Sequence, residues 1–317
     1  MGTPCTTINK MCGSGMKAAM LAHDHILAGS GRIAIAGGLE SMSNAPYLLP
    51  KARGGYRLGN GELLDHMFVD GLEDAYEPGK LMGNFAEDCA ERYSFSRKDQ
   101  DDFAIESLTR ATEAIENGAF RDEIIAVSVN TRKETMTVDT DEQPLAANIE
   151  KIPYLKPAFQ KDGTVTPANS SSISDGAAAL VMMRLSDAEK GGHVPLAQVR
   201  GHASFAQEPG WFTTAPVFAI GKLLDSLQWD VSMVDLFEVN EAFAVVAMAA
   251  MKDLGIPHEK LNVHGGACAL GHPVGASGAR IIVTLLHALE RYDLQRGVAS
   301  LCIGGGEATA MAFERIR

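Results

Sequence analysis

The chain has 317 residues, of which 46% are hydrophobic and 21% charged, and its formal net charge is −12. This globular composition excludes bulk disorder, collagen-like repeats and a coiled coil, and at about 150 residues per domain the length predicts about two domains. The acidic balance argues against a nucleic-acid partner, which would require a basic face. The longest apolar stretch, residues 242–251, is shorter than the ~18 residues of a membrane span. We therefore expect a cytoplasmic protein with no membrane partner.

The cysteines are few, widely spaced and without a CxxC pair. They are Cys5, Cys12, Cys89, Cys268 and Cys302. This pattern favours reduced thiols in a cytosolic compartment over a disulfide framework or a structural zinc site. Any chemistry that they perform is expected from individual thiolates.

In the first part of the chain, apolar spacing predicts a helix over residues 14–29 and a short buried strand over 32–36, which ends in the glycine-rich residues 37–40. From residue 44 to 170 the chain carries most of its charge. This region contains a predicted helix over 97–117 and a polar stretch, 131–163, that is expected to form loops.

The remainder of the chain alternates between strand and helix patterns. Strands are predicted over residues 177–183, 196–199, 234–239 and 298–303, and helices over 217–227, 241–254 and 276–289. Such alternation indicates an α/β fold in which helices cover a sheet.

Two segments of the chain also resemble each other. Ser14 opens a helix that is followed by a strand leading to Glu40, and Ser277 opens a second helix followed by a strand leading to Glu307. A duplication of this kind predicts two similar halves facing each other, with both helix starts near one axis.

Cys12 precedes the first of these helices and has small neighbours. A thiol at a helix N-terminus faces the positive end of the helix dipole, so the thiolate form is expected to be favoured there. The alternative is an inert buried cysteine, which is what most free cysteines are.

His272 lies in a loop of small residues, 265–278 (GGACALGHPVGASG), with no charged residue next to it. A histidine in this setting can accept the proton of Cys12, as a thiol nucleophile requires. The loop could instead cradle a phosphate, but it lacks the lysine of a P-loop.

Cys302 ends a predicted strand just before a triple glycine, 304–306, whose backbone N–H groups could stabilise an oxyanion. A thiol there could act as acid or base toward carbon, or it could be structural. Asn240 follows another strand. It is either a helix N-cap or a polar group at the carboxyl edge of the sheet, where α/β sites usually lie.

Together these segments resemble the thiolase family, in particular its acetyl-CoA acetyltransferase members, over essentially the whole chain. The motifs that carry the resemblance are residues 9–15 (NKMCGSG), 240–244 (NEAFA), 271–278 (GHPVGASG) and 302–306 (CIGGG). Four motifs in the family's order favour the catalytic interpretation of Cys12.

The resemblance implies an α/β thiolase fold, with two similar βαβ-type halves in a layered α/β/α/β/α arrangement and an inserted loop domain. Residues 1–43, continued at 171–195, match the N-terminal half, residues 44–170 the loop domain and residues 196–317 the C-terminal half. Only eleven residues precede Cys12, whereas one βαβ unit takes about 30. We therefore expect an incomplete first half, with exposed apolar sheet edges.

The resemblance also implies a reaction, the reversible Claisen condensation of two acetyl-CoA to acetoacetyl-CoA and CoA. Cys12, activated by His272, would carry the acyl group, and Cys302 would be the acid and base. Asn240 would hold a water that, with His272, stabilises the enolate oxygen. The N–H groups of Cys12 and Gly304 would stabilise the tetrahedral oxyanion. Coenzyme A thioesters are the substrates, and no metal or other cofactor is implied.

Further positions match substrate-binding residues of the family: Met82, Lys156, Phe159, Ser171, Phe212 and Phe243. The bulk of Met82 and Phe212 favours a short acyl group. Leu81 stands where short-chain members carry a histidine, which leaves the preferred length of the acyl chain open. Ser171 and Phe159 could instead be a turn serine and a core aromatic, and Lys156 is a candidate for the CoA phosphates.

The family resemblance predicts a homo-oligomer, either a dimer built on the core or a tetramer in which a loop over residues 46–62 adds the further contact. Two alternatives stay open. One is a 3-ketoacyl-CoA thiolase of fatty-acid β-oxidation that acts on longer chains, and the other is an inactive, truncated thiolase-like protein that binds or assembles. A ketoacyl synthase of the same fold fits less well, because Cys302 precedes three glycines.

Overall fold

The computed structural model of the chain describes residues 2–130, 132 and 134–316. Its largest sheet contains, in spatial order, β7 (Ala197–Ala206), β10 (Glu307–Arg315), β9 (Arg296–Ile303) and β8 (Leu236–Val239). β10 runs antiparallel to both β7 and β9, and β8 runs parallel to β9.

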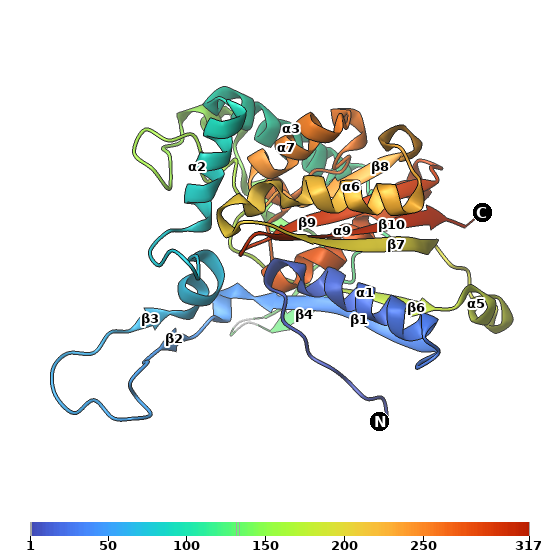
Figure 1. Cartoon of the computed structure of the whole chain (residues 1–317), viewed down its shortest axis with the longest axis horizontal. Helices are drawn as coiled ribbons and strands as arrows, with labels where there is room; N and C mark the ends of the chain where they lie inside the picture. The colour runs from blue at the N-terminus through green and yellow to red at the C-terminus, as the bar shows by residue number, and fades with distance from the viewer. Residues whose placement is uncertain (1, 131, 133, 317) are drawn as a thin grey trace.

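Helices cover both faces of this sheet (Figure 1). One face packs on α6 (Ala215–Leu227) and α7 (Ala244–Leu254), and the other on α1 (Ser14–Leu27) and α9 (Val274–Arg291). Because side chains alternate along a strand, β9 contributes Val298 and Cys302 to the first core cluster and Ala299 and Leu301 to the second.

A second sheet, formed by the antiparallel pair β1 (Ile33–Ser41) and β6 (Asp175–Met183), lies on the other side of α1 and α9 (Figure 1). Its outer face is apolar and open to solvent: Ile35 and Leu39 are each 76% exposed and Val181 66%. The described residues therefore form four successive layers: α6 with α7, the larger sheet, α1 with α9, and the β1–β6 sheet. No described helix covers the outer face of the β1–β6 sheet.

The two helices between the sheets approach each other closely at their N-termini. A Cβ on Gly15 of α1 would lie 2.6 Å from the backbone nitrogen of Ala279 in α9, and one on Gly278 of α9 would lie 2.4 Å from that of Met16 in α1. Small residues are required on both sides of this reciprocal contact. The starts of the two duplicated helices thus meet, as the internal repeat predicts.

The region between the halves contains α2 (Met82–Tyr93) and α3 (Arg97–Glu116), the hairpin strands β2 (Tyr47–Leu48) and β3 (Leu64–Asp65), and the pair β4 (Val127–Asn130) and β5 (Thr135–Val138). Figure 1 shows β2, β3 and their connection extending away from the body of the molecule.

Short helical segments complete the chain. They are Met11–Gly13, Met42–Asn44, Phe68–Leu72, α4 (Glu142–Ala146), Ile149–Tyr154, α5 (Leu185–Gly191), Pro209–Thr214, Val231–Met233, His258–Lys260 and α8 (Ala267–Leu270). Sequence analysis expected loops over residues 131–163. The described part of this stretch instead contains β5, α4 and a 3-10 turn. Sequence analysis also missed α2, α5 and β10. Within the described ranges, no helix combines the length and the hydropathy needed to cross a bilayer.

Candidate active site

Cys12 lies in the 3-10 turn Met11–Gly13, directly before α1. The turn is tight, with Met11 at a φ of 50°, in the left-handed region that side chains rarely adopt. Gly13 packs against the end of β9, since a Cβ on it would lie 2.4 Å from Cδ1 of Ile303. The half-buried Cys12 is therefore held against the C-terminal end of β9.

The glycine run after β9 turns its backbone toward this thiol. The backbone N–H of Gly304 lies close enough to the Cys12 sulfur to lower the pKa of this thiol. Gly305 and Gly306 have φ values of 93° and 89°, which glycine adopts at little cost. Cys302, just before the run, is close enough that charge on Cys12 raises the pKa of the Cys302 thiol. The structure thus brings the two predicted thiols together.

His272 precedes α9 and is buried. Its Nδ1 lies 2.5 Å from Oγ of Ser277, and that hydroxyl donates its only hydrogen to the carbonyl of Pro273 at 3.0 Å. The serine oxygen must then accept from Nδ1–H, so the hydrogen-bond network assigns the proton to Nδ1. Nε2 is buried without a hydrogen-bond partner among the described residues, and in this tautomer it is free to accept a proton.

Glu40 connects the His272 loop to the Cys12 turn. The N–H of Gly275 donates to Glu40 Oε2 at 3.0 Å, and the negative charge of Glu40 acts on the Cys12 thiol. Backbone contact here is close, because a Cβ on Gly38 would lie 1.9 Å from the carbonyl oxygen of Gly275. The turn that carries Cys12 also contacts α9 directly.

Asn240 follows β8 and is fixed by its backbone N–H, which donates to Ser300 O at 3.0 Å. Its Nδ2 lies 3.5 Å from Nδ1 of His272, at the outer limit of hydrogen bonding. Both nitrogens are donors in the assigned tautomer, so this contact is a close approach. Arg280 Nη2 donates to Asn240 Oδ1 at 3.4 Å. The amide is therefore adjacent to the imidazole, as sequence analysis predicted.

The protonation state of Cys12 differs from the expectation. Burial raises its pKa to about 11, even though the N–H groups of Gly304 and of Cys12 itself lower it, and the charge of Glu40 raises it further. The prediction that the helix start favours the thiolate is therefore wrong for the resting site, because loss of hydration outweighs the backbone N–H groups.

The other two groups are also neutral at rest. Burial, and then the charge of Arg280, lowers the pKa of His272 to about 3, so at neutral pH the imidazole can accept a proton. Burial, and then the charge on Cys12, raises the pKa of Cys302 well above its ordinary value. The site at rest thus holds two thiols and a neutral imidazole.

Three of the predicted substrate-binding residues lie near the Asn240 motif. Ser171 donates from both its backbone N–H and its Oγ to the carbonyl of Ala242, each at 3.0 Å. The rings of Phe159 and Phe243 meet edge to face with centroids 6.0 Å apart. Phe159 also lies against Gly83, where a Cβ would come within 2.3 Å of the ring.

The other three predicted substrate-binding residues lie in different surroundings. Met82 approaches the glycine run, since a Cβ on Gly304 would lie 3.2 Å from its sulfur. Phe212 is only 2% exposed and packs edge to face on Phe85. Lys156 is exposed on the surface.

Sequence analysis did not identify Ser277 as the residue that orients His272. It also did not identify Glu241 as a buried residue that holds neighbouring segments together by hydrogen bonds. The Glu241 carboxylate accepts hydrogen bonds from Ser107 Oγ at 2.7 Å, Asn262 Nδ2 at 2.8 Å and the backbone N–H of Cys268 at 3.1 Å. These bonds fix the segment after β8. The sequence feature that could have indicated this role is the position of Glu241 directly after Asn240.

Domains of one known protein family match nearly the whole chain. The N-terminal domain of thiolase matches residues 1–186, and the C-terminal domain of thiolase matches residues 193–315. The acetyl-CoA acetyltransferase of Escherichia coli (strain K12) is 49% identical over 312 residues, which cover 98% of this chain and 79% of the relative. That of Pseudomonas aeruginosa is 46% identical over 317 residues, covering 99% and 80%.

Two solved structures have the same fold. The Bacillus anthracis acetyl-CoA acetyltransferase superposes with a TM-score of 0.94 at 41% identity, over 98% of this chain and 78% of that one. The Acat5 thiolase of Ascaris suum, solved in complex with coenzyme A, superposes with a TM-score of 0.92 at 43% identity, over 98% and 79%.

Proposed function

Because this chain belongs to the thiolase family, we propose that it is an acetyl-CoA C-acetyltransferase, which reversibly joins two acetyl-CoA into acetoacetyl-CoA and CoA. The observation that carries the proposal is the contact between the Cys12 turn and the end of β9, where Gly13 packs against Ile303 and the thiol of Cys302 lies near that of Cys12. Relatives that are 46% and 49% identical and bear the acetyltransferase name support the choice of reaction.

In the first half-reaction, Nε2 of His272 takes the Cys12 proton and the sulfur attacks the thioester carbon of acetyl-CoA. The N–H groups of Cys12 and Gly304 stabilise the oxyanion of the tetrahedral intermediate, and such donors typically contribute about 3 kcal/mol each. The C–S bond to CoA then breaks. CoA thiolate leaves with a proton from Cys302, and the acetyl group remains on Cys12.

Acetylation prepares the second half-reaction. With the Cys12 sulfur held in a thioester, the Cys302 thiolate left by the first half-reaction is available as the base of the site. The Cys302 thiolate removes a methyl proton from a second acetyl-CoA, and protonated His272 with a water on Asn240 stabilises the enolate. The enolate carbon attacks acetyl-Cys12, the C–S bond breaks, and His272 returns its proton to Cys12.

Substrate binding follows from the same assignment. We place coenzyme A along Ser171 and Phe159, with Lys156 near its phosphates, and the acyl group beside Met82, Phe212 and Phe243. No cofactor or metal takes part in the proposed chemistry, because the two thiols and the imidazole supply the nucleophile, the acid and the base.

Chain-length preference tests the proposal directly. The purified protein is assayed for CoA-dependent cleavage of acetoacetyl-CoA and of 3-ketooctanoyl-CoA, and we expect the higher kcat/KM for acetoacetyl-CoA. A higher kcat/KM for the eight-carbon substrate would instead favour a longer-chain thiolase. Absence of turnover on both would favour a binding or assembly role.

We further propose that the protein acts as a homo-oligomer, a dimer or a tetramer, in the cytoplasm. The extended hairpin of β2 and β3 (Figure 1) supports an assembly contact. All five cysteines are free thiols, as suits a reducing compartment.

A further inference from the structure

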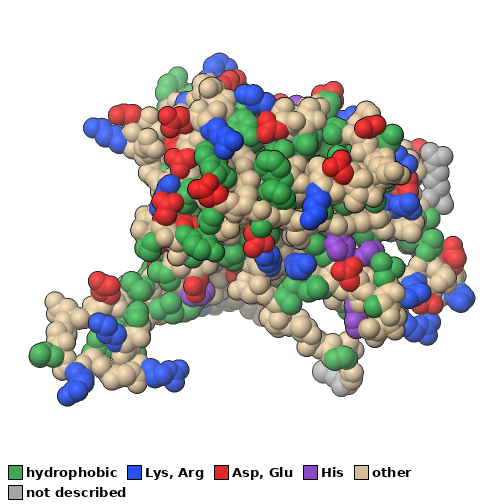
Figure 2. Space-filling view, viewed as in Figure 1, with side chains coloured by type: hydrophobic (Ala, Val, Ile, Leu, Met, Phe, Trp, Pro, Cys, Tyr) green, Lys and Arg blue, Asp and Glu red, His purple; other side chains and the backbone are tan. Residues whose placement is uncertain are grey.

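A cluster of metal-binding side chains lies outside the candidate active site. Nδ1 of His23 is 3.2 Å from Oδ1 of Asp24, and Nε2 of His202 is 2.8 Å from the same oxygen. The three ligand atoms all lie within 4.8 Å of one another. In Figure 2, histidine side chains gather beside an acidic one on the surface where α1 and β7 meet in Figure 1.

A β-bulge aims His202 into this cluster. β10 pairs Phe313 with Val199 and Ala312 with Gly201, which leaves Arg200 as an extra residue in β7. One extra residue reverses the alternation of side chains along the strand. His202 therefore faces the α1 side of the sheet, opposite a residue of β10 that packs in the same core cluster as α1.

The chemistry and spacing of the ligand atoms suit a first-row divalent cation. Zinc binds imidazole nitrogen and carboxylate oxygen at about 2.0–2.2 Å, so tetrahedral ligand atoms lie about 3.3–3.5 Å apart. The two measured separations, 3.2 and 2.8 Å, require only small side-chain adjustments. The imidazoles are each 19% exposed and the carboxylate 55%, so a water can reach the fourth position.

We propose that His23, Asp24 and His202 form a binding site for a zinc-type divalent cation. Two of the ligands come from α1 and the third from β7, 178 residues further along the chain. The ion would therefore connect the helix between the sheets to the edge strand of the larger sheet. Such a cross-link stabilises the folded chain by binding it in preference to the unfolded one.

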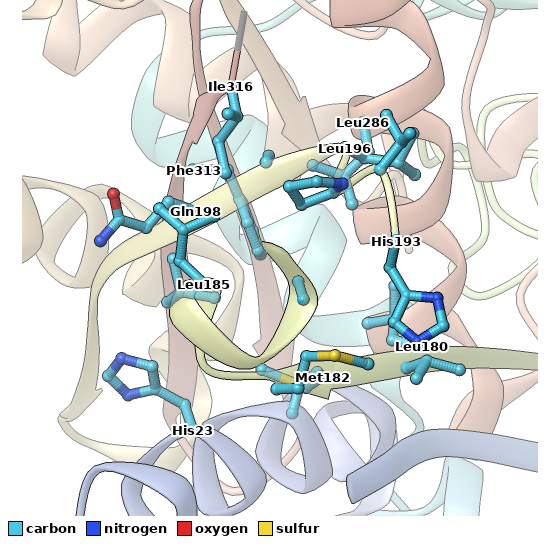
Figure 3. Close-up of a pocket in the computed structure, with 18 of the residues that line it drawn as sticks. His23, Leu180, Met182, Leu185, His193, Leu196, Gln198, Leu286, Phe313 and Ile316 are labelled. Atoms are coloured by element: carbon cyan, nitrogen blue, oxygen red, sulfur yellow. The ribbon is translucent and has the colours of Figure 1, made fainter. Parts of the chain in front are cut away.

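The site is separate from the reaction centre. Cys12 precedes the first residue of α1, whereas His23 and Asp24 lie in its last turns, and at 1.5 Å per residue these positions are roughly 15 Å apart. Figure 3 shows His23 projecting from α1 at one side of a mainly apolar cavity of about 880 Å³ between α1, β6 and β7. The ion is therefore expected to affect stability more than turnover.

Zinc titration of the purified full chain tests the proposal. Accessible thiols, Cys12 among them, are first alkylated with iodoacetamide at alkaline pH, and binding of Zn²⁺ at neutral pH is then measured against a chromogenic chelator. His202→Gln and Asp24→Asn should each weaken zinc binding by at least about 100-fold, since loss of a residue behind a ligand already costs about 10–100-fold. His25→Gln, an exposed histidine of the same helix outside the cluster, is the matched control and should bind like the wild type.

Thermal unfolding supplies a second measurement that does not depend on activity. Zinc should raise the Tm of the wild type and of His25→Gln, and leave the Tm of His202→Gln unchanged. A cobalt-loaded sample should show d–d absorption without a thiolate charge-transfer band. Equal zinc affinity in the wild type and His202→Gln, or no saturable binding in the wild type, would overturn the proposal.

Discussion

At the scale of single residues, the imidazole of His272 and the thiol of Cys12 are both neutral in the resting site. Burial lowers the pKa of His272 to about 3 and raises that of Cys12 to about 11. At neutral pH the imidazole is therefore unprotonated and the thiol is protonated. This is the state from which a proton can pass from sulfur to nitrogen when substrate arrives.

The free Cys12 thiol should therefore react slowly with alkylating agents at neutral pH. Because its pKa lies near 11, its thiolate fraction, and with it the rate of iodoacetamide labelling, should rise about tenfold per pH unit from 7 to 10. Peptide mass spectrometry on a Cys5→Ser background follows Cys12 without the exposed thiol. A rate that levels off below pH 8 would show instead a stable thiolate–imidazolium pair.

Ser277 should act as a positioning residue for His272. Removing its hydroxyl in Ser277→Ala frees Nδ1 from the 2.5 Å contact that sets the tautomer. A general base contributes ~10²–10⁴-fold, so misorienting it should lower kcat by about tenfold or more, with a smaller change in KM. Ser277→Thr, which keeps the hydroxyl, should recover most of kcat. Equal activity in the alanine and wild-type enzymes would rule out this role.

The grouping of Cys12, Asn240, His272 and Cys302 could be predicted from sequence, because the motifs around these residues are short and local. The charge of Cys12 could not be predicted, since its burial depends on the end of β9, hundreds of residues away. Ser277 was likewise missed, because in a run of small residues a hydroxyl is equally well explained by helix packing.

At the scale of secondary-structure elements, the site depends on glycines that let α1, β1 and α9 approach one another. A methyl group at Gly38 would lie 1.9 Å from the backbone oxygen of Gly275, next to the His272 loop. Backbone atoms cannot move aside as side chains do. The first turn of α9 is thus fixed by β1, since its N-cap residue, Pro273, makes no side-chain capping hydrogen bond.

Gly38→Ala should therefore lower the free energy of unfolding by about 3 kcal/mol or more and reduce turnover with it. Gly221→Ala is the matched control, because a Cβ there, within α6, meets nothing within 4 Å. It should stabilise the protein by about 0.5–1 kcal/mol. Urea unfolding midpoints measure both changes, and a loss that is equal in the two variants would contradict this packing argument.

Most elements of the α/β alternation were predictable from apolar periodicity, but not all. β10 was missed because its alanines and methionine favour a helix, and only pairing with both β7 and β9 makes it a strand. α2 was missed because its apolar face is short and is buried by contacts with α7 and the Pro209–Thr214 turn. In both cases tertiary contacts override local propensity.

At the scale of the whole molecule, the outer face of the β1–β6 sheet is an apolar surface in contact with solvent. Ile33, Ile35, Leu39 and Val181 are all more than 60% exposed there. Contiguous exposed apolar patches and unpaired strand edges promote association. At high concentration, copies of the chain are therefore expected to associate through this face in addition to the proposed contact through the extended β2–β3 hairpin.

A charge at the centre of this face should reduce such association. Sedimentation velocity of Ile35→Lys should show less concentration-dependent association than the wild type. Leu58→Lys places the same charge at a fully exposed leucine on the connection between β2 and β3. If Leu58→Lys dissociates the protein and Ile35→Lys does not, the association surface is the extended hairpin rather than the sheet face.

The central claim is that Cys12 carries the acyl group while Cys302 moves the proton. The most direct test is to mix the protein with acetyl-CoA, quench it in acid and locate the thioester by peptide mass spectrometry. We predict an acetyl group on the peptide that contains Cys12, in the wild type and in Cys302→Ala, and no acetylated peptide in Cys12→Ala. Acetylation of a different cysteine, or turnover of acetoacetyl-CoA by Cys12→Ala at the wild-type rate, would contradict the account.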